Sequence, residues 1–172
     1  MRSPFRMYPE PTSWWSFADY GCVLSVVQEI GAKTMLEFGP DSSTLTLIEG
    51  GATRIDCCED DPEWATTYRA RLETAYPEIV TIVPYEWADP LEAALLPGRE
   101  YDLALIDGPR DVERRHAVIR YCAARCRYLL VPLEDIQHPT MLRPTVESLG
   151  RPVKYIASGA LAGTFALVGP AC

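Results

Sequence analysis

The sequence lacks the features that mark several large classes of protein. No apolar stretch approaches the ~18 residues of a membrane-spanning helix, and no apolar run follows the arginines and prolines of residues 1–10. We therefore expect neither a membrane span nor a signal peptide. The chain has only two histidines and no CxxC pair, so the usual spacing of structural zinc ligands is absent. These absences predict a cytoplasmic protein without membrane contact.

Positive charge is also scarce. Sixteen Lys and Arg residues against 24 Asp and Glu residues give a net charge of −8 and a pI near 4.8. Because proteins that bind nucleic acid through its phosphates usually carry a basic face, we expect no nucleic-acid partner. The main basic group lies in a helical pattern and forms a solvated helix face, a homodimer contact or a patch for an anionic substrate. It comprises Arg110, Arg114, Arg115, Arg120, Arg125 and Arg127.

The six cysteines do not indicate a disulfide framework. Cys57 and Cys58 are adjacent within an apolar, strand-like run, so we expect their side chains on opposite faces of a sheet. Cys122 and Cys126 lie one helical turn apart. Buried, reduced thiols are the expected state, which fits a reducing compartment.

Short β-rich apolar runs alternate with helical segments along the chain. This alternation predicts right-handed βαβ crossovers and a mainly parallel sheet. The last two runs are separated by six residues, too few for a helical crossover, and should form an antiparallel hairpin. The predicted strands are 34–38, 54–58, 79–84, 102–106, 128–131, 153–157 and 164–168. The predicted helices are 16–30 (ending at Gly31), 61–76, 90–96, 111–126 and 141–149. The second of these is predicted to begin with Asp61 as its N-cap and Pro62 as its first helical residue.

Length and pattern together predict one α/β domain. With 172 residues, the chain is expected to fold as a single Rossmann-like, doubly wound domain over residues 16–172. Its mainly parallel seven-stranded sheet ends in the antiparallel hairpin. Residues 1–15 are an irregular aromatic segment, either a lid whose Tyr8, Trp14 and Trp15 line a pocket or a cover for the sheet edge.

Carboxylates follow each predicted parallel strand. In open α/β sheets this edge binds ligands at the switch in strand order. A single acid there is an ordinary loop or cap residue, but five such positions together predict an electronegative crevice for a cationic or polyhydroxyl ligand, or a metal. The carboxylates are Glu37, Glu59, Asp60, Glu86, Asp89, Asp107, Glu134 and Asp135.

The turn after the first strand is the most informative segment. Gly39 lets the backbone turn tightly and approach a ligand, and Ser42 or Ser43 can cap the next helix. Glu59, twenty residues past Gly39, ends the second strand. An acid at that distance can accept hydrogen bonds from both hydroxyls of a ribose.

These segments resemble the motifs of class I S-adenosylmethionine-dependent methyltransferases. The similarity lies in residues 36–44, in Glu59 with residues 61–64, and in residues 101–109. It implies a seven-stranded sheet with an antiparallel last strand, and S-adenosylmethionine as cofactor. Glu37 and Gly39 would then lie against the methionine part and Glu59 would bind the ribose. Glu86, Trp87 or Asp89 would flank the adenine.

The chain departs from this family in its glycine turn. The family has three alternating glycines, and here Asp41 and Ser43 follow Gly39 at the second and third positions. Asp tolerates the left-handed conformation better than most residues, but it adds a side chain where backbone packs against the cofactor. A nicotinamide dehydrogenase is disfavoured, because Asp41 and an acidic crevice would repel a pyrophosphate. An inactive binding or scaffold protein and another Rossmann-like nucleotide-binding enzyme remain alternatives.

The resemblance implies a methyltransferase with a small-molecule acceptor. Candidates for acid–base chemistry are Asp107, Glu134, Asp135 and His138, although methyl transfer can proceed by positioning alone. Asp107 orients the substrate, caps the following helix or binds a metal. Some similar O-methyltransferases hold a divalent metal here with an asparagine among its ligands. This sequence contains no Asn, so we expect no metal.

Overall fold

The computed structural model describes residues 17–88, 91, 95, 98–133, 141–158 and 164–171. They form a seven-stranded sheet with the order β3-β2-β1-β4-β5-β7-β6. Strands β1 to β5 run parallel, and β7 is antiparallel to both of its neighbours, β5 and β6. The strands are β1 (Thr34–Phe38), β2 (Arg54–Glu59), β3 (Val80–Pro84), β4 (Tyr101–Ile106), β5 (Cys126–Pro132), β6 (Val153–Ala157) and β7 (Thr164–Val168).

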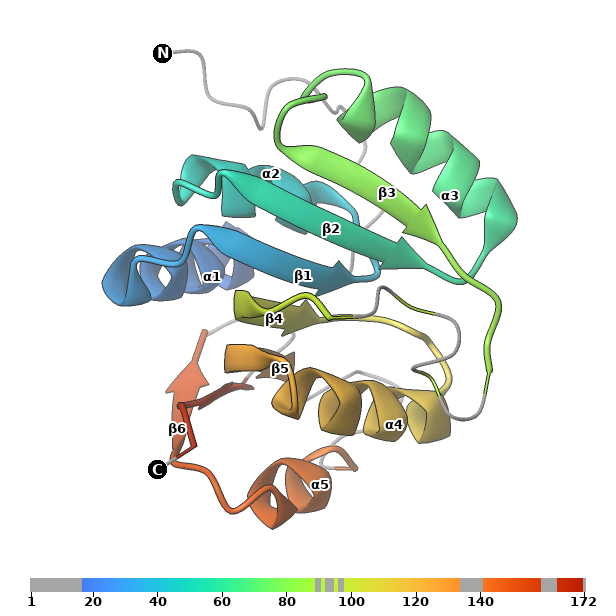
Figure 1. Ribbon diagram of the computed structural model, residues 1–172. Coiled ribbons are helices and arrows are strands. Elements are labelled where there is room, and N and C mark those ends of the chain that lie inside the picture. The colour runs from blue at the N-terminus through green and yellow to red at the C-terminus, as the bar shows by residue number, and fades with distance from the viewer. Residues whose placement is uncertain are drawn as a thin grey trace.

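Helices cover both faces of this sheet (Figure 1). The first three pack on one face, and the last two pack on the other. None of the helices in the described part of the chain is long and apolar enough to cross a membrane. The helices are α1 (Phe17–Ile30), α2 (Ser42–Glu49), α3 (Pro62–Tyr68), α4 (Val112–Ala123) and α5 (Arg143–Ser148).

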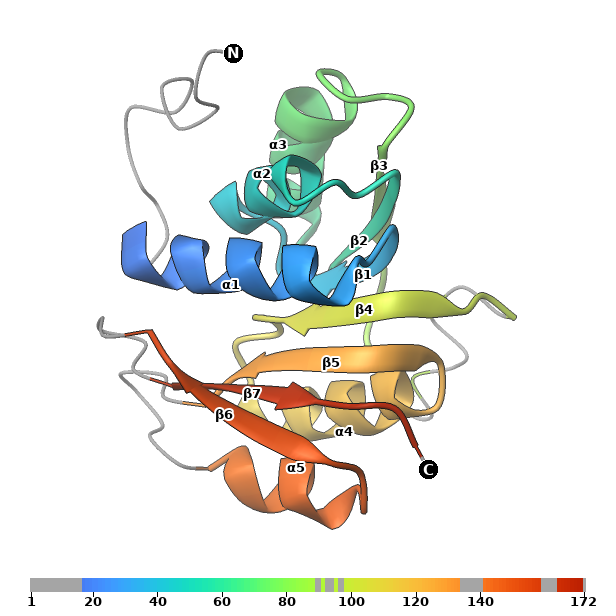
Figure 2. The same ribbon diagram turned by 90° about the vertical axis from the view of Figure 1, so that its left-hand side faces the viewer.

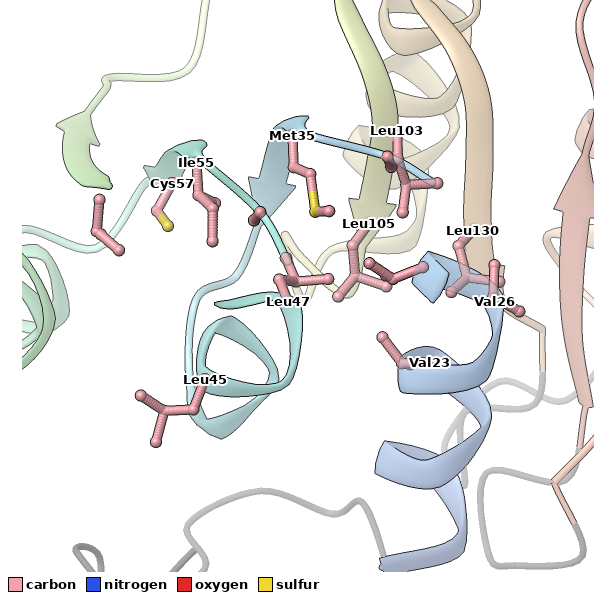
Figure 3. Packing of buried hydrophobic residues seen from close by; sticks show 14 of the residues in the cluster. Val23, Val26, Met35, Leu45, Leu47, Ile55, Cys57, Leu103, Leu105 and Leu130 are labelled. Atoms are coloured by element: carbon pink, nitrogen blue, oxygen red, sulfur yellow. The ribbon is translucent and has the colours of Figure 1, made fainter. Parts of the chain in front are cut away.

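Side-chain alternation along the strands divides the core into two apolar clusters. Cys57 belongs to the cluster under α1, α2 and α3, and Cys58 to the cluster under α4 and α5, as their adjacency predicts. Figure 3 shows Val23 and Val26 of α1 and Leu47 of α2 on the first of these faces. The five cysteines that the structure describes are free thiols.

The predicted fold class is confirmed, including the closing hairpin (Figure 2). Gly31 follows α1 with φ +64°, the left-handed conformation that ends many helices. The helix predicted over residues 61–76 is shorter, because α3 ends at Tyr68 and Arg69–Glu73 form a π-helical turn. The helix predicted over residues 90–96 and the segment 1–15 lie mainly or wholly outside the described residues.

Candidate functional site

Glu37 lies near the end of β1 and is fully buried on the face that α2 covers. Its Oε1 accepts a hydrogen bond from Ser43 Oγ at 2.6 Å, and its Oε2 accepts one from Thr44 Oγ1 at 2.6 Å. The Cys57 thiol donates to Oε2 at 3.3 Å. Burial raises the pKa of Glu37 to about 7 despite these bonds, and the charge of Asp107 raises it further.

The first turn of α2 differs from expectation at two residues. Ser43 was expected either to cap the helix or to act only as a substitute for glycine, but its hydroxyl instead binds Glu37. The N-cap is Asp41, whose side chain makes no capping hydrogen bond. Asp41 has φ −161°, which is extended backbone, so its tolerance of the left-handed conformation is not used here. Glu37 connects the first turn of α2 to β1, because both of its carboxylate oxygens accept hydrogen bonds from the hydroxyls of Ser43 and Thr44.

Gly39 lies where three strand ends meet, and its φ is +78°. A Cβ at this position would lie 2.9 Å from the backbone nitrogen of Gly108, and a Cβ on Gly108 would lie 2.9 Å from the nitrogen of Gly39. The Gly39 N–H donates to Cys58 O, and the Gly108 N–H donates to Phe38 O at 2.8 Å. Gly39 thus makes a close backbone contact with Gly108, on a loop 69 residues later in the chain. Its predicted approach to a ligand stays a prediction.

Glu59 ends β2 at the same edge of the sheet as Gly39. Its Oε1 accepts a hydrogen bond from the Asp61 backbone N–H at 3.0 Å. Burial raises the pKa of Glu59 to about 7, and the neighbouring charges of Asp60 and Asp61 act in the same direction. Asp61 in turn caps α3, as predicted, by accepting from Glu63 N and Trp64 N. Glu59 is therefore a partly buried carboxylate held in place by the start of a helix.

Asp107 follows β4 and is half-buried. The charge of Asp107 contributes to the raised pKa of Glu37. The helix after β4 is capped by Asp111, whose side chain accepts from Arg114 N at 2.9 Å. The capping role considered for Asp107 therefore belongs to Asp111.

Tyr68 is a residue that the sequence reasoning missed. It is buried at the end of α3, and its ring stacks on Trp64 with centroids 5.5 Å apart. Burial raises the pKa of its hydroxyl, and the charges of Asp41 and Glu59 raise it further. The i,i+4 spacing of Trp64 and Tyr68 was the available signal, and it predicts only that both lie on one helix face.

The six basic residues do not form one solvated face. Arg115 is 4% exposed and donates to Pro109 O, whereas Arg120 is exposed on α4. Arg114 reaches Asp60, with Nη1 3.4 Å from Oδ2, and its guanidinium lies over the ring of Trp87. Arg115 is thus buried, Arg114 is paired with Asp60, and Arg120 is exposed to solvent.

The remaining predicted residues divide into two groups. Trp87 is half-buried and Glu86 is exposed after β3. Four others lie outside the described residues, and these are Asp89, Glu134, Asp135 and His138. Within the described ranges, no group of three or more His, Cys, Asp or Glu side chains is arranged to hold a metal ion.

Comparison with known proteins reveals similarity at the level of structure. No family model and no curated protein matches the sequence. The O-methyltransferase from Bacillus cereus in complex with SAH superposes with a TM-score of 0.66 at 18% identity, over 92% of this chain and 84% of that chain. TomG from Streptomyces achromogenes, an O-methyltransferase involved in tomaymycin synthesis and in complex with SAM, gives a TM-score of 0.65 at 18% identity, over 95% and 85%. Cofactor-bound Rv0187 from MTB superposes with a TM-score of 0.69 at 20% identity, over 92% of this chain and 82% of that chain. The chain therefore has the fold of these three proteins, two of which are O-methyltransferases.

Proposed function

We propose that this protein binds S-adenosylmethionine at the carboxyl edge, where strands β1 to β5 end, and transfers its methyl group to a small-molecule acceptor. One observation carries the proposal. Glu37, Glu59 and Asp107 lie at or just beyond the carboxyl ends of three neighbouring strands, β1, β2 and β4, whose ends are joined by the hydrogen bonds of Gly39 and Gly108. This edge is the ligand-binding side of open α/β sheets, and the fold is shared with proteins bound to SAM and SAH.

The charge at this edge supports a cationic ligand. S-adenosylmethionine carries a sulfonium and an ammonium and no phosphate, whereas a dinucleotide would bring a pyrophosphate against several carboxylates. A close pair of opposite charges contributes ~1–4 kcal/mol at dielectric constants typical of surfaces. Acids therefore favour the methyl donor over the dinucleotide by a margin of this size.

The residues present fit the parts of this cofactor. Glu59 is partly buried and has a raised pKa, so hydroxyl donors from a ribose would stabilise its ionised form. Glu37 already accepts bonds from Ser43 and Thr44, so its contribution is to hold the turn of Gly39 against which the methionine part would lie. Trp87 and Glu86 follow β3 where the adenine would lie, and Asp89 continues that segment.

The chemistry requires little beyond positioning. When bound, S-adenosylmethionine would supply an activated methyl group. The acceptor would form a bond to the methyl carbon as the sulfur–carbon bond breaks, with S-adenosylhomocysteine as the leaving group and the acceptor's proton passing to solvent. Correct positioning can contribute up to ~7–11 kcal/mol, so no general base is obligatory. Asp107 is assigned the role of orienting the acceptor. Asp107→Asn should therefore keep cofactor affinity and reduce turnover, without dependence on added Mg²⁺. Activity that is lost with a chelator and restored by Mg²⁺ would instead favour a metal site.

Calorimetric titration with S-adenosylmethionine and S-adenosylhomocysteine tests the proposal. Glu59→Ala should weaken binding of S-adenosylhomocysteine by about 1.5–3 kcal/mol, the contribution of a charge-assisted hydrogen bond. Glu63→Ala, an exposed position on α3, is the matched control and should leave affinity unchanged. Unchanged affinity of Glu59→Ala would contradict the ribose assignment. Binding without methylation of any acceptor in a broad screen would favour a binding or scaffold protein.

A further inference from the structure

Three segments that are distant in the sequence converge beside the end of β2. Asp60 follows β2, Trp87 follows β3, and Arg114 lies in the first turn of α4. The Arg114 guanidinium carbon lies 5.2 Å from the centre of the Trp87 ring, and Nη1 lies 3.4 Å from Asp60 Oδ2. One guanidinium thus links the loops after β2 and β3 to the helix after β4.

The surroundings of this cluster hold it in place. Tyr85, two residues before Trp87, is buried and packs edge-on against Phe38 at 6.0 Å. The backbone of Arg114 is fixed because its N–H donates to the N-cap carboxylate of Asp111. The Arg114 side chain nevertheless remains 43% exposed. The guanidinium contacts Trp87 and Asp60, but its exposed part remains accessible to a ligand.

A solvated ion pair is the simplest alternative explanation for this contact. Exposed pairs contribute little to stability, and either Lys or Arg would serve in one. The contact with Trp87 is different, because the guanidinium carbon lies over the face of the indole ring, a cation–π contact in which Arg is found more often than Lys. The cluster therefore combines two interactions that hold one guanidinium in place.

Charge restricts which part of a ligand this arginine can face. S-adenosylmethionine carries its sulfonium and ammonium toward the methionine end, where a guanidinium would repel them. The purine is uncharged and flat, and planar guanidinium groups stack on bases. Building on the proposed function, we propose that Arg114 forms one wall of the adenine subsite. Asp60 and Trp87 hold the guanidinium, and the adenine stacks on the face turned away from Trp87.

The test compares Arg114→Ala, Arg114→Lys and the unaltered protein for binding of S-adenosylhomocysteine and of adenosine. Arg114→Ala should weaken both ligands about tenfold, because both lose the same stacking contact. Arg114→Lys keeps the charge without the plane and should recover less than half of that loss on a logarithmic scale. Arg120→Ala, an exposed arginine on the same helix, is the control and should change neither affinity.

The outcomes separate this inference from the proposed function. Equal affinity of Arg114→Ala and the unaltered protein for S-adenosylhomocysteine would overturn the inference and leave the proposed function intact. A loss for S-adenosylhomocysteine without an equal loss for adenosine would also overturn it, because the contact would then lie on the amino-acid part. If the unaltered protein bound no S-adenosylhomocysteine, both the proposed function and the inference would be wrong.

Discussion

The carboxyl groups at the two edges of the sheet have pKa values shifted in opposite directions. At the carboxyl edge, Glu37 is fully buried and Glu59 is partly buried, and neither forms an ion pair with another described residue. Burial raises the pKa of each to about 7. At the amino edge, where β1 and β4 begin, Asp102 Oδ2 accepts from Lys33 N, Thr34 N and Thr34 Oγ1. Burial opposes ionisation of Asp102 as well, but these backbone donors hold its pKa below the ordinary value.

Arg151 completes the contrast at the amino edge. Its guanidinium donates to four carbonyl oxygens, those of Gly169, Ala123, Cys126 and Arg127, and so joins the starts of β5 and β6 to the end of β7. A hollow of about 370 Å³ lies nearby and is lined in part by Thr34 and Asp102. At the amino edge Asp102 and Arg151 are both held by hydrogen bonds to the protein, although burial lowers the pKa of Arg151. The acidic charge at the carboxyl edge is matched less completely, which suits a cationic ligand.

The largest expected effect on stability concerns Gly39, whose backbone packs tightly against that of Gly108 at the carboxyl edge. Gly39→Ala adds a Cβ at φ +78° and 2.9 Å from the Gly108 nitrogen, so both strain and a backbone clash oppose it. We expect a loss of about 3–5 kcal/mol in the free energy of unfolding, measured with urea. Gly31→Ala, at φ +64° with nothing within 4 Å, should cost only about 1–2 kcal/mol. Equal losses would show that strain alone acts at Gly39.

The next largest effect tests the difference in pKa between the edges. Unfolded Glu37 releases its proton near pH 4.5 and folded Glu37 near pH 7, so the folded state binds more protons between these values. Its contribution to stability is therefore complete below pH 4.5 and is lost as the pH rises through 7, by on the order of 3 kcal/mol. Urea unfolding at pH 5 and pH 8 should show this loss in the unaltered protein.

Two variants isolate the contribution of Glu37. Glu37→Gln should remove about 3 kcal/mol of the pH dependence, because the amide does not titrate. Asp102→Asn is the control from the amino edge. Since the pKa of Asp102 is lowered, its contribution is lost only as the pH falls through that lowered value, and it should not alter the change between pH 5 and pH 8. A Glu37→Gln protein with an unaltered pH profile would contradict the raised pKa.

The amino edge itself is tested at Arg151. Arg151→Ala leaves four carbonyl groups without this donor, and we expect a loss of about 2 kcal/mol in unfolding free energy because the side chain is only partly buried. Lys154→Ala removes an exposed pair with Glu29 and should cost less than about 1 kcal/mol. Calorimetry on Arg151→Ala should give unchanged affinity for S-adenosylhomocysteine. A loss of affinity without a loss of stability would mean that the amino edge also takes part in ligand binding.

The sequence predicts local features well and contacts between distant loops poorly. The strands 34–38, 153–157 and 164–168 match the structure, because apolar periodicity and turn residues are local signals. Asp61 is the predicted cap of α3 for the same reason. The bond from Ser43 to Glu37 and the packing of Gly39 on Gly108 depend on how β1 meets α2 and β4. No spacing along the chain reveals which partner a hydroxyl or a glycine will meet there.

The smallest expected effect concerns Asp41, the acid in place of the family's second glycine. Its side chain makes no capping bond, and its extended backbone is open to any residue. Asp41→Gly should therefore change the free energy of unfolding by less than about 1 kcal/mol. Removal of the side chain should relieve crowding against the cofactor and tighten binding of S-adenosylhomocysteine about threefold in a calorimetric titration.

Asp41→Asn separates size from charge at the same position. The amide keeps the volume of the carboxylate, so under the crowding explanation it should bind S-adenosylhomocysteine no more tightly than the unaltered protein does. If Asn tightened binding as much as Gly, the charge of Asp41 would be the cause, and the acidic edge would then contain one carboxylate that opposes its ligand. A tenfold loss in Asp41→Gly would instead identify a direct contact of Asp41 with the ligand's ammonium, which would add this residue to the cation-binding group of the carboxyl edge.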